Sequence, residues 1–189
     1  LDSYSTHYDD GYNAMMAQKL GFADFDPATD ADLIADLQTV LQLSETDMTL
    51  FFRNLADVVV DGLCTPDAID PSLTSFEEAY YLPDSLSDEQ RSQTLTWMRR
   101  YIDRLRRDGT PDQTRRQRMN AVNPKYVLRN YLAQLAIDKS ELGDHSMVKE
   151  LLDVLRRPYD EQPEKEEFAK KRPEWARHRT GCSMLSCSS

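Results

Sequence analysis

Residues 87–109 read SDEQRSQTLTWMRRYIDRLRRDG, and this stretch decides the fold class. Ser87 can cap the start of a helix, and Gly109 can end one. Between them, apolar side chains recur at mostly three- and four-residue spacing, as they do along one face of a helix. They are Leu95, Trp97, Met98, Tyr101, Ile102 and Leu105. The stretch therefore predicts one long helix, rich in arginine toward its end.

The same spacing recurs along most of the chain, bounded by residues that cap or end helices. We predict further helices over residues 4–20, from Asp30 through Leu41, from Thr46 or Asp47 to Gly62, over residues 76–82, from Asn123-Pro124 to Leu142-Gly143, and from Asp144 to just before Pro158. Residues 62–75 hold Gly, Pro, Asp, Ser and Thr, which indicates a loop.

These patterns predict a mainly α protein, a helical bundle followed by an extended arm. Residues 1–157 form the predicted helical domain. Residues 158–189 are rich in Pro, Glu, Lys and Arg and end in a Ser-rich tail with cysteines, so we expect an extended arm with at most a short helix. Phe168 and Trp175 are its expected anchors.

Charge is distributed unevenly. The net charge is −10, yet residues 99–129 carry 10 basic and 3 acidic side chains, against 3 basic and 19 acidic in residues 1–98. We interpret the basic stretch as a solvated helix or as a surface facing an acidic part of the same protein. A pI of 4.8 argues against nucleic-acid binding. No apolar stretch approaches the roughly 18 residues that a membrane span needs, so neither nucleic acid nor membrane is an expected partner.

Glycine spacing argues against a nucleotide site in this chain. The closest two of the six glycines lie ten residues apart, whereas a phosphate-binding loop needs several glycines within a few residues. The His-Arg-Asp and Asp-Phe-Gly motifs of kinases are also missing from the sequence. We therefore predict no catalytic, cofactor-binding or metal-binding residue here.

The three cysteines leave three interpretations open. Cys187 is the third residue from the end, near the basic residues Arg177 and Arg179, so it is either a redox-active thiol or an inert terminal cysteine. His178, Cys182 and Cys187, with Cys64, could bind zinc, but their spacing is looser than zinc motifs usually show. Cys187 is thus the candidate redox residue that the sequence alone offers.

Several strings resemble the selenoprotein O family of protein adenylyltransferases. The most specific is MNAVNPKYVLRNYLAQ at residues 119–134. Others are KLG at residues 19–21, FFRNL at residues 51–55, and RPYD, PEWA and SCSS in residues 157–189. The resemblance covers essentially the whole chain and implies the C-terminal part of a kinase-like protein whose start lies upstream of Leu1.

The resemblance implies transfer of AMP from ATP, with Mg or Mn, to Ser, Thr or Tyr hydroxyls of substrate proteins. The family's catalytic motifs match no position in this chain, so its expected partner is its own N-terminal kinase-like domain. Family members often carry selenocysteine or cysteine third from the end, here Cys187, which implies a redox role toward a cysteine of that domain. Cys182 is the alternative partner and the second candidate redox residue. Expected locations are the cytoplasm in a bacterium and the mitochondrion in a eukaryote. The alternative is a freestanding helical interaction module.

Overall fold

The long central helix forms as its end signals predict. The computed structural model describes residues 2–60 and 76–182, and in it α5 spans Asp88–Asp108. The Ser87 hydroxyl accepts a hydrogen bond from the Gln90 backbone N–H, and the Gln90 side chain accepts one from the Ser87 N–H, which is a complete capping box. Gly109 ends the helix with a φ of 62°, a left-handed conformation that suits glycine.

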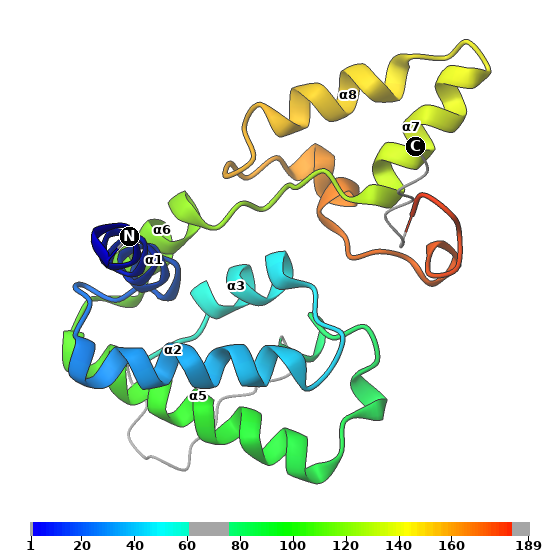
Figure 1. The fold of residues 1–189 in the computed structure, drawn as a ribbon. Coiled ribbons are helices and arrows are strands. Elements are labelled where there is room, and N and C mark those ends of the chain that lie inside the picture. The colour runs from blue at the N-terminus through cyan, green and yellow to red at the C-terminus, as the bar shows by residue number, and fades with distance from the viewer. Residues whose placement is uncertain (1, 61–75, 183–189) are drawn as a thin grey trace. The chain divides into compact units, whose positions relative to one another are not determined.

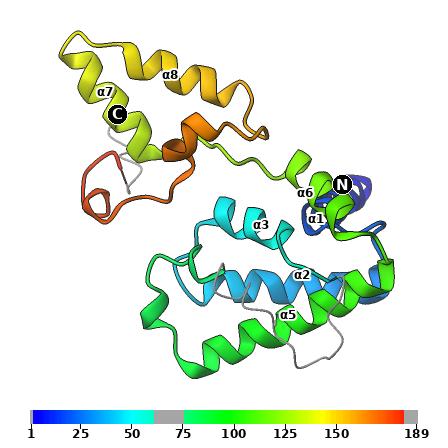
Figure 2. The same cartoon turned by 180° about the vertical axis from the view of Figure 1, so that it is seen from behind.

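The chain divides into two compact units, Leu1–Asn123 and Pro124–Ser189, and the predicted boundary after residue 157 falls inside the second of them. The first unit contains α1 (Asp2–Leu20), α2 (Pro27–Gln42), α3 (Met48–Ala56), a 3₁₀ turn (Pro83–Ser85), α5 and α6 (Asp112–Val122). Both views of the ribbon show α2 running beside α5 (Figures 1 and 2). The predicted mainly α class is confirmed, and within residues 2–60 and 76–182 the only strand-like pairing is an isolated bridge between Thr46 and Tyr80.

The core of the first unit is rich in aromatic rings. Trp97 of α5 stacks on Tyr101 with ring centroids 5.2 Å apart, and Phe51 of α3 meets Phe76 edge-on at 5.4 Å. The Trp97 indole N–H donates to the Leu33 carbonyl of α2 at 2.8 Å, so its buried polar atom is paired. The rings of Phe51 and Trp97 also lie 6.3 Å apart between centroids, so the predicted apolar face of α5 packs against both α2 and α3.

The second unit is a helical hairpin covered by the chain that follows it. α7 (Asn130–Glu141) and α8 (Ser146–Leu155) pack on each other, and the later residues form two 3₁₀ segments, Pro163–Ala169 and Glu174–Ala176. Phe168 is buried in this core, as predicted for an anchor. Trp175 is half exposed and meets Tyr131 edge-on at 6.3 Å. Residues 158–182 thus belong to the packing of this unit.

The structure corrects several predicted helix ends. Asp26, not Asp30, caps α2, and Pro27 occupies its first turn. α3 starts after Asp47 as predicted but ends at Ala56, well before Gly62, which lies outside the described residues together with the predicted 62–75 loop. Of the helix predicted over residues 76–82, only 76 and 77 are helical within the described part.

The largest error concerns Pro124. The helix predicted to start at Asn123-Pro124 begins only at Asn130, because the backbone N–H groups of Lys125 and Tyr126 both donate to the Pro158 carbonyl, at 2.8 and 3.1 Å. That pairing holds residues after Pro124 in an extended path. Helix α6, by contrast, was not predicted from the sequence.

Asp30, wrongly predicted as a cap, is instead a fully buried ion-pair partner. Arg104 of α5 donates to its carboxylate at 2.7 and 3.2 Å, and to Asp108 and the Asp24 carbonyl as well. Burial alone would raise the pKa of Asp30, but hydrogen bonds from Arg104 and from the Asp26 N–H outweigh it and hold the pKa below its usual value.

This pair predicts loss of stability in acid. A carboxyl group with a lowered pKa in the folded state stabilises the fold above its unfolded pKa of about 3.9, and the contribution disappears as pH falls through the folded pKa. We expect Asp30→Asn to remove part of the acid dependence of the unfolding free energy, whereas Asn at the exposed Asp32 of the same helix should not. Urea unfolding from about pH 2 to about pH 7 measures this. Equal acid dependence in Asp30→Asn and the native chain would contradict it.

Candidate functional site

Three of the family-like strings meet around one buried side chain, Asn123, within the first unit. The Lys19 ammonium of α1 donates to the Asn123 amide oxygen at 2.6 Å, and the Asn123 amide nitrogen donates back to the Lys19 carbonyl at 2.9 Å. Arg53 of α3 donates to the Asn123 carbonyl at 3.3 Å. The strings at residues 19–21, 51–55 and 119–134 therefore share a junction of α1, α3 and the end of α6.

Lys19 sits in an environment that suits a partly buried cation. Its ammonium lies 4.2 Å from the centre of the Phe52 ring, a cation–π distance. Burial lowers the pKa of Lys19. The amide oxygen and the aromatic face stabilise the ammonium without a full ionic bond, so the arrangement ties α1 to the end of α6 through a specific, geometry-dependent contact.

Beside this junction, the guanidinium of Arg115 is fully buried at the end of α3. It donates to the carbonyls of Leu55 (3.4 Å) and Val58 and to the Asp112 carboxylate (3.0 Å). Carbonyls at a helix C-terminus have no partner inside the helix, so a cation placed there satisfies both the hydrogen bonds and the helix dipole. Arg115 thus fixes α6 onto the end of α3.

Gly21 completes the junction by letting α6 approach closely. Its φ is +78°, and an added Cβ would lie 2.7 Å from the Met119 sulfur and 2.8 Å from Cγ of Arg115. Only glycine fits both the backbone conformation and this space. The KLG string is therefore explained by packing against the first residue of the 119–134 string.

The two predicted redox residues are placed differently. Cys182 is a free, buried cysteine in the core of the second unit, so the structure does not present it as an exposed thiol. Cys187 and Cys64 lie outside the described residues. Within the residues that are described, no group of three or more His, Cys, Asp or Glu is arranged to hold a metal ion.

The chain leading to Cys187 is anchored on α7. Arg179 forms an ion pair with Asp138 at 2.6 Å, and hydrogen bonds from Gln134 and Arg179 lower the pKa of Asp138. Gly181, with a φ of +80°, touches Gln134 so closely that an added Cβ would lie 3.1 Å from its Cδ and nearer still to its Oε1. These contacts hold the chain in place up to Cys182.

This anchor predicts that Gly181→Ala frees Cys182. With Cys64→Ser and Cys187→Ser as background, we expect Cys182 to react slowly with a thiol reagent. We expect it to react at least about tenfold faster after Gly181→Ala, because the new methyl group must displace the Gln134 amide that braces the tail, and because alanine strains the backbone at a φ of +80°. Gly143→Ala is the matched control: its φ is also positive, +85°, but nothing lies within 4 Å. Equal rates in the two variants would contradict the anchor.

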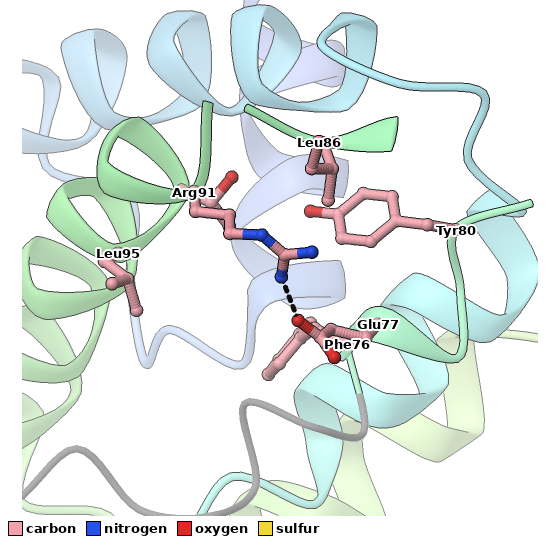
Figure 3. A pocket seen from close by; sticks show the side chains of 7 residues that line it. Phe76, Glu77, Tyr80, Leu86, Arg91 and Leu95 are labelled. Atoms are coloured by element: carbon pink, nitrogen blue, oxygen red, sulfur yellow. Dashed lines mark hydrogen bonds and ion pairs between the residues drawn. The ribbon is translucent and has the colours of Figure 1, made fainter. Parts of the chain in front are cut away.

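A small cavity in the first unit holds an ion pair (Figure 3). It measures about 200 Å³ and its walls include Phe76, Tyr80 and Leu86. Arg91 pairs with Glu77 and also donates to the Pro83 carbonyl at 2.8 Å. Ligand sites usually measure about 300–1,000 Å³. Because these charges are already used in mutual contacts, the cavity supports a structural role better than a catalytic one.

The residues that hold the Asn123 junction and the tail anchor on α7 could not be identified from the sequence. Arg115 stands among charged neighbours in a segment without a clear apolar face, and Asp138 is an ordinary helix-surface acid by spacing. A usable signal did exist for Gly21 and Asn123, since both fall in the family-like strings.

Within the described residues, the helices are too short or too polar to cross a membrane.

Comparison with known proteins finds a matching family and relatives of high sequence identity. Residues 1–156 match the family described as protein adenylyltransferase SelO. The chain is 54% identical over 98% of its length to protein nucleotidyltransferase YdiU of Rhodopirellula baltica, and covers 35% of that protein. It is 46% identical over its full length to YdiU of Aromatoleum aromaticum, covering 34% of it. It thus spans about a third of these relatives. Since both the family match and the identities cover most of its residues, the chain belongs to the SelO family of protein adenylyltransferases.

Proposed function

We propose that this chain is the C-terminal segment of a protein nucleotidyltransferase that transfers AMP from ATP, with Mg or Mn, to Ser, Thr or Tyr hydroxyls of proteins. The observation that carries the proposal is the identity of 54% and 46% to proteins named nucleotidyltransferases, spread over nearly the entire chain. The widely spaced glycines agree with a nucleotide site outside residues 1–189.

Within that enzyme, we assign the segment a structural role. Its most constrained side chains already have partners within the first unit. Arg115 donates to the Leu55 carbonyl at the end of α3, and Lys19 and Asn123 hydrogen-bond to each other. Groups that act as general acids or bases need access to a substrate proton, and buried groups tied to backbone carbonyls lack it. The segment's own contribution is therefore rigid support for the kinase-like part.

We further assign Cys187 a redox-regulatory role. Oxidation would join its sulfur to that of a cysteine in the kinase-like part, releasing two protons and passing two electrons to an oxidant such as glutathione disulfide. Arg179 and Gly181 anchor the preceding chain on α7, and only four residues separate Cys182 from Cys187. The anchor therefore limits how far Cys187 can lie from the second unit, which supports a defined partner for its thiol. A disulfide that closes a long loop restricts the open ensemble by about 2–4 kcal/mol, enough to shift a two-state segment.

The AMP-transfer proposal is tested with labelled ATP. The polypeptide encoded by the complete gene containing this chain is incubated with Mg and a protein mixture, and with ATP labelled at either the α- or the γ-phosphate. We expect protein-bound label from α-labelled ATP only, since AMP retains the α-phosphate. Label from γ-labelled ATP would indicate a kinase instead, and no label from either would contradict the proposal.

A further inference from the structure

The second unit carries an apolar groove that no described residue fills. It lies between α7 and α8 and has a volume of about 600 Å³. Its lining is almost entirely aliphatic, and several of the large side chains are about half exposed: Leu128, Ile137, Val148 and Leu152. Scattered exposed leucines need no explanation, but aliphatic side chains gathered along one groove usually mark a binding surface.

The sequence of α8 explains why the groove exists. Met147, Leu151 and Val154 are buried in the hairpin core, yet Val148 and Leu152 repeat the same spacing one position later. The apolar stripe of α8 is therefore wider than its packing in this unit requires. On α7, Ala133 and Ile137 similarly face the groove, four residues apart. Two helices thus offer a second apolar face.

A polar atom within the groove lacks a partner. The Ser140 hydroxyl oxygen is covered from solvent and makes no hydrogen bond within the described residues. Serine in a helix commonly bonds the carbonyl four residues earlier, and a covered hydroxyl without any partner is unfavourable. Because this oxygen has almost no exposed surface, it marks imperfect packing beneath the groove and is not itself a contact for an occupant.

The groove's size argues for an occupant from the same polypeptide. Residues 148–155 of α8 extend about 10 Å, which accommodates about two turns of a helix with apolar side chains at i and i+4. Stable dimers bury about 800 Å² on each partner, much more than a two-turn groove offers. A segment of the same polypeptide needs less buried area to stay bound, because its effective concentration is in the millimolar range. The relatives contain about twice as much chain outside the matched third as within it.

We propose that this groove binds an amphipathic helix from the part of the polypeptide outside residues 1–189, and so fastens the second unit to the rest of the enzyme. The inference rests on the proposed function, because it takes the chain to be part of a longer nucleotidyltransferase. The occupant presents two or three aliphatic or aromatic side chains to the groove formed by Ile137, Val148 and Leu152.

Photo-crosslinking in the complete polypeptide tests the proposal. Benzoylphenylalanine is introduced at Leu152 inside the groove, at Glu141 on its rim, which leaves the apolar floor intact, and at Leu142 as a control. Leu142 is 87% exposed and does not line the groove. We expect irradiation at 152 or 141 to join the probe, within one molecule, to a peptide outside residues 1–189, in at least about fivefold higher yield than at 142.

Three outcomes overturn the groove proposal: a link to a second copy, a link only to residues 1–189, or yields at both groove positions no higher than at Leu142. AMP transfer is measured on the same samples. Crosslinking without transfer contradicts the proposed function but leaves the groove assignment standing. Transfer without crosslinking contradicts the groove assignment but leaves the proposed function standing, so the two failures are distinguishable.

Discussion

Arg115→Ala lowers the free energy of unfolding of the first unit by about 3–5 kcal/mol, the largest effect expected of any single substitution here. The guanidinium is 1% exposed and donates to two carbonyls at the end of α3 and to Asp112. Alanine removes the donor from those acceptors. It also creates a cavity beside Gly21 and Met119.

Urea unfolding followed by circular dichroism measures the change, with the two units analysed as separate transitions if the curve shows two. Arg116→Ala is the matched control. Arg116 adjoins Arg115 on α6, but its side chain is 59% exposed and pairs with the exposed Asp57, so its loss should cost less than about 1 kcal/mol. A similar cost for the two variants would show that the buried arginine does not hold α6 on α3.

Gly21→Ala is expected to cost about 2–5 kcal/mol. The new Cβ must adopt a φ of +78°, which is strained for alanine, and it must displace Met119 and Arg115, whose side-chain atoms lie 2.7–2.9 Å from its position. Gly11→Ala provides the opposite control. Nothing lies within 4 Å of a Cβ there, and Gly11 is in the interior of α1, so alanine should stabilise by about 0.5–1 kcal/mol.

Opposite signs for the two glycine variants in the same thermal or urea unfolding experiment would confirm that Gly21 is required by a close approach of α6. A neutral effect of Gly21→Ala, with the stabilising effect of Gly11→Ala intact, would contradict that packing.

The fold could be predicted where local chemistry sets the helix ends. Ser87 and Gly109 bound α5 in both the sequence and the structure, because a side-chain cap and a left-handed glycine act within a few residues. The start of α7 could not be predicted from Asn123-Pro124, since the competing acceptor, the Pro158 carbonyl, lies far along the chain. α6 was missed because its buried face consists of Arg115 and Met119 rather than a run of aliphatic residues.

The candidate site shows the same division. The family-like strings mark Lys19, Gly21 and Asn123 separately, but nothing in their spacing predicts that they meet, because the contacts join residues about 100 positions apart. Cys182 appeared available by its position near the end of the chain. It is buried because Gly181 and Arg179 attach the tail to α7, a contact that depends on tertiary packing. The role of Cys187 stays a prediction.

The most direct test of the account is the redox dependence of AMP transfer by the complete polypeptide. Transfer from α-labelled ATP is measured in reduced and in oxidised glutathione buffers for the native protein, Cys187→Ser and Cys182→Ser. We expect the native protein and Cys182→Ser to change activity between the buffers, and Cys187→Ser to have the same activity in both. Redox dependence that persists unchanged in Cys187→Ser, or its absence from the native protein, would contradict the regulatory role assigned to the C-terminal tail.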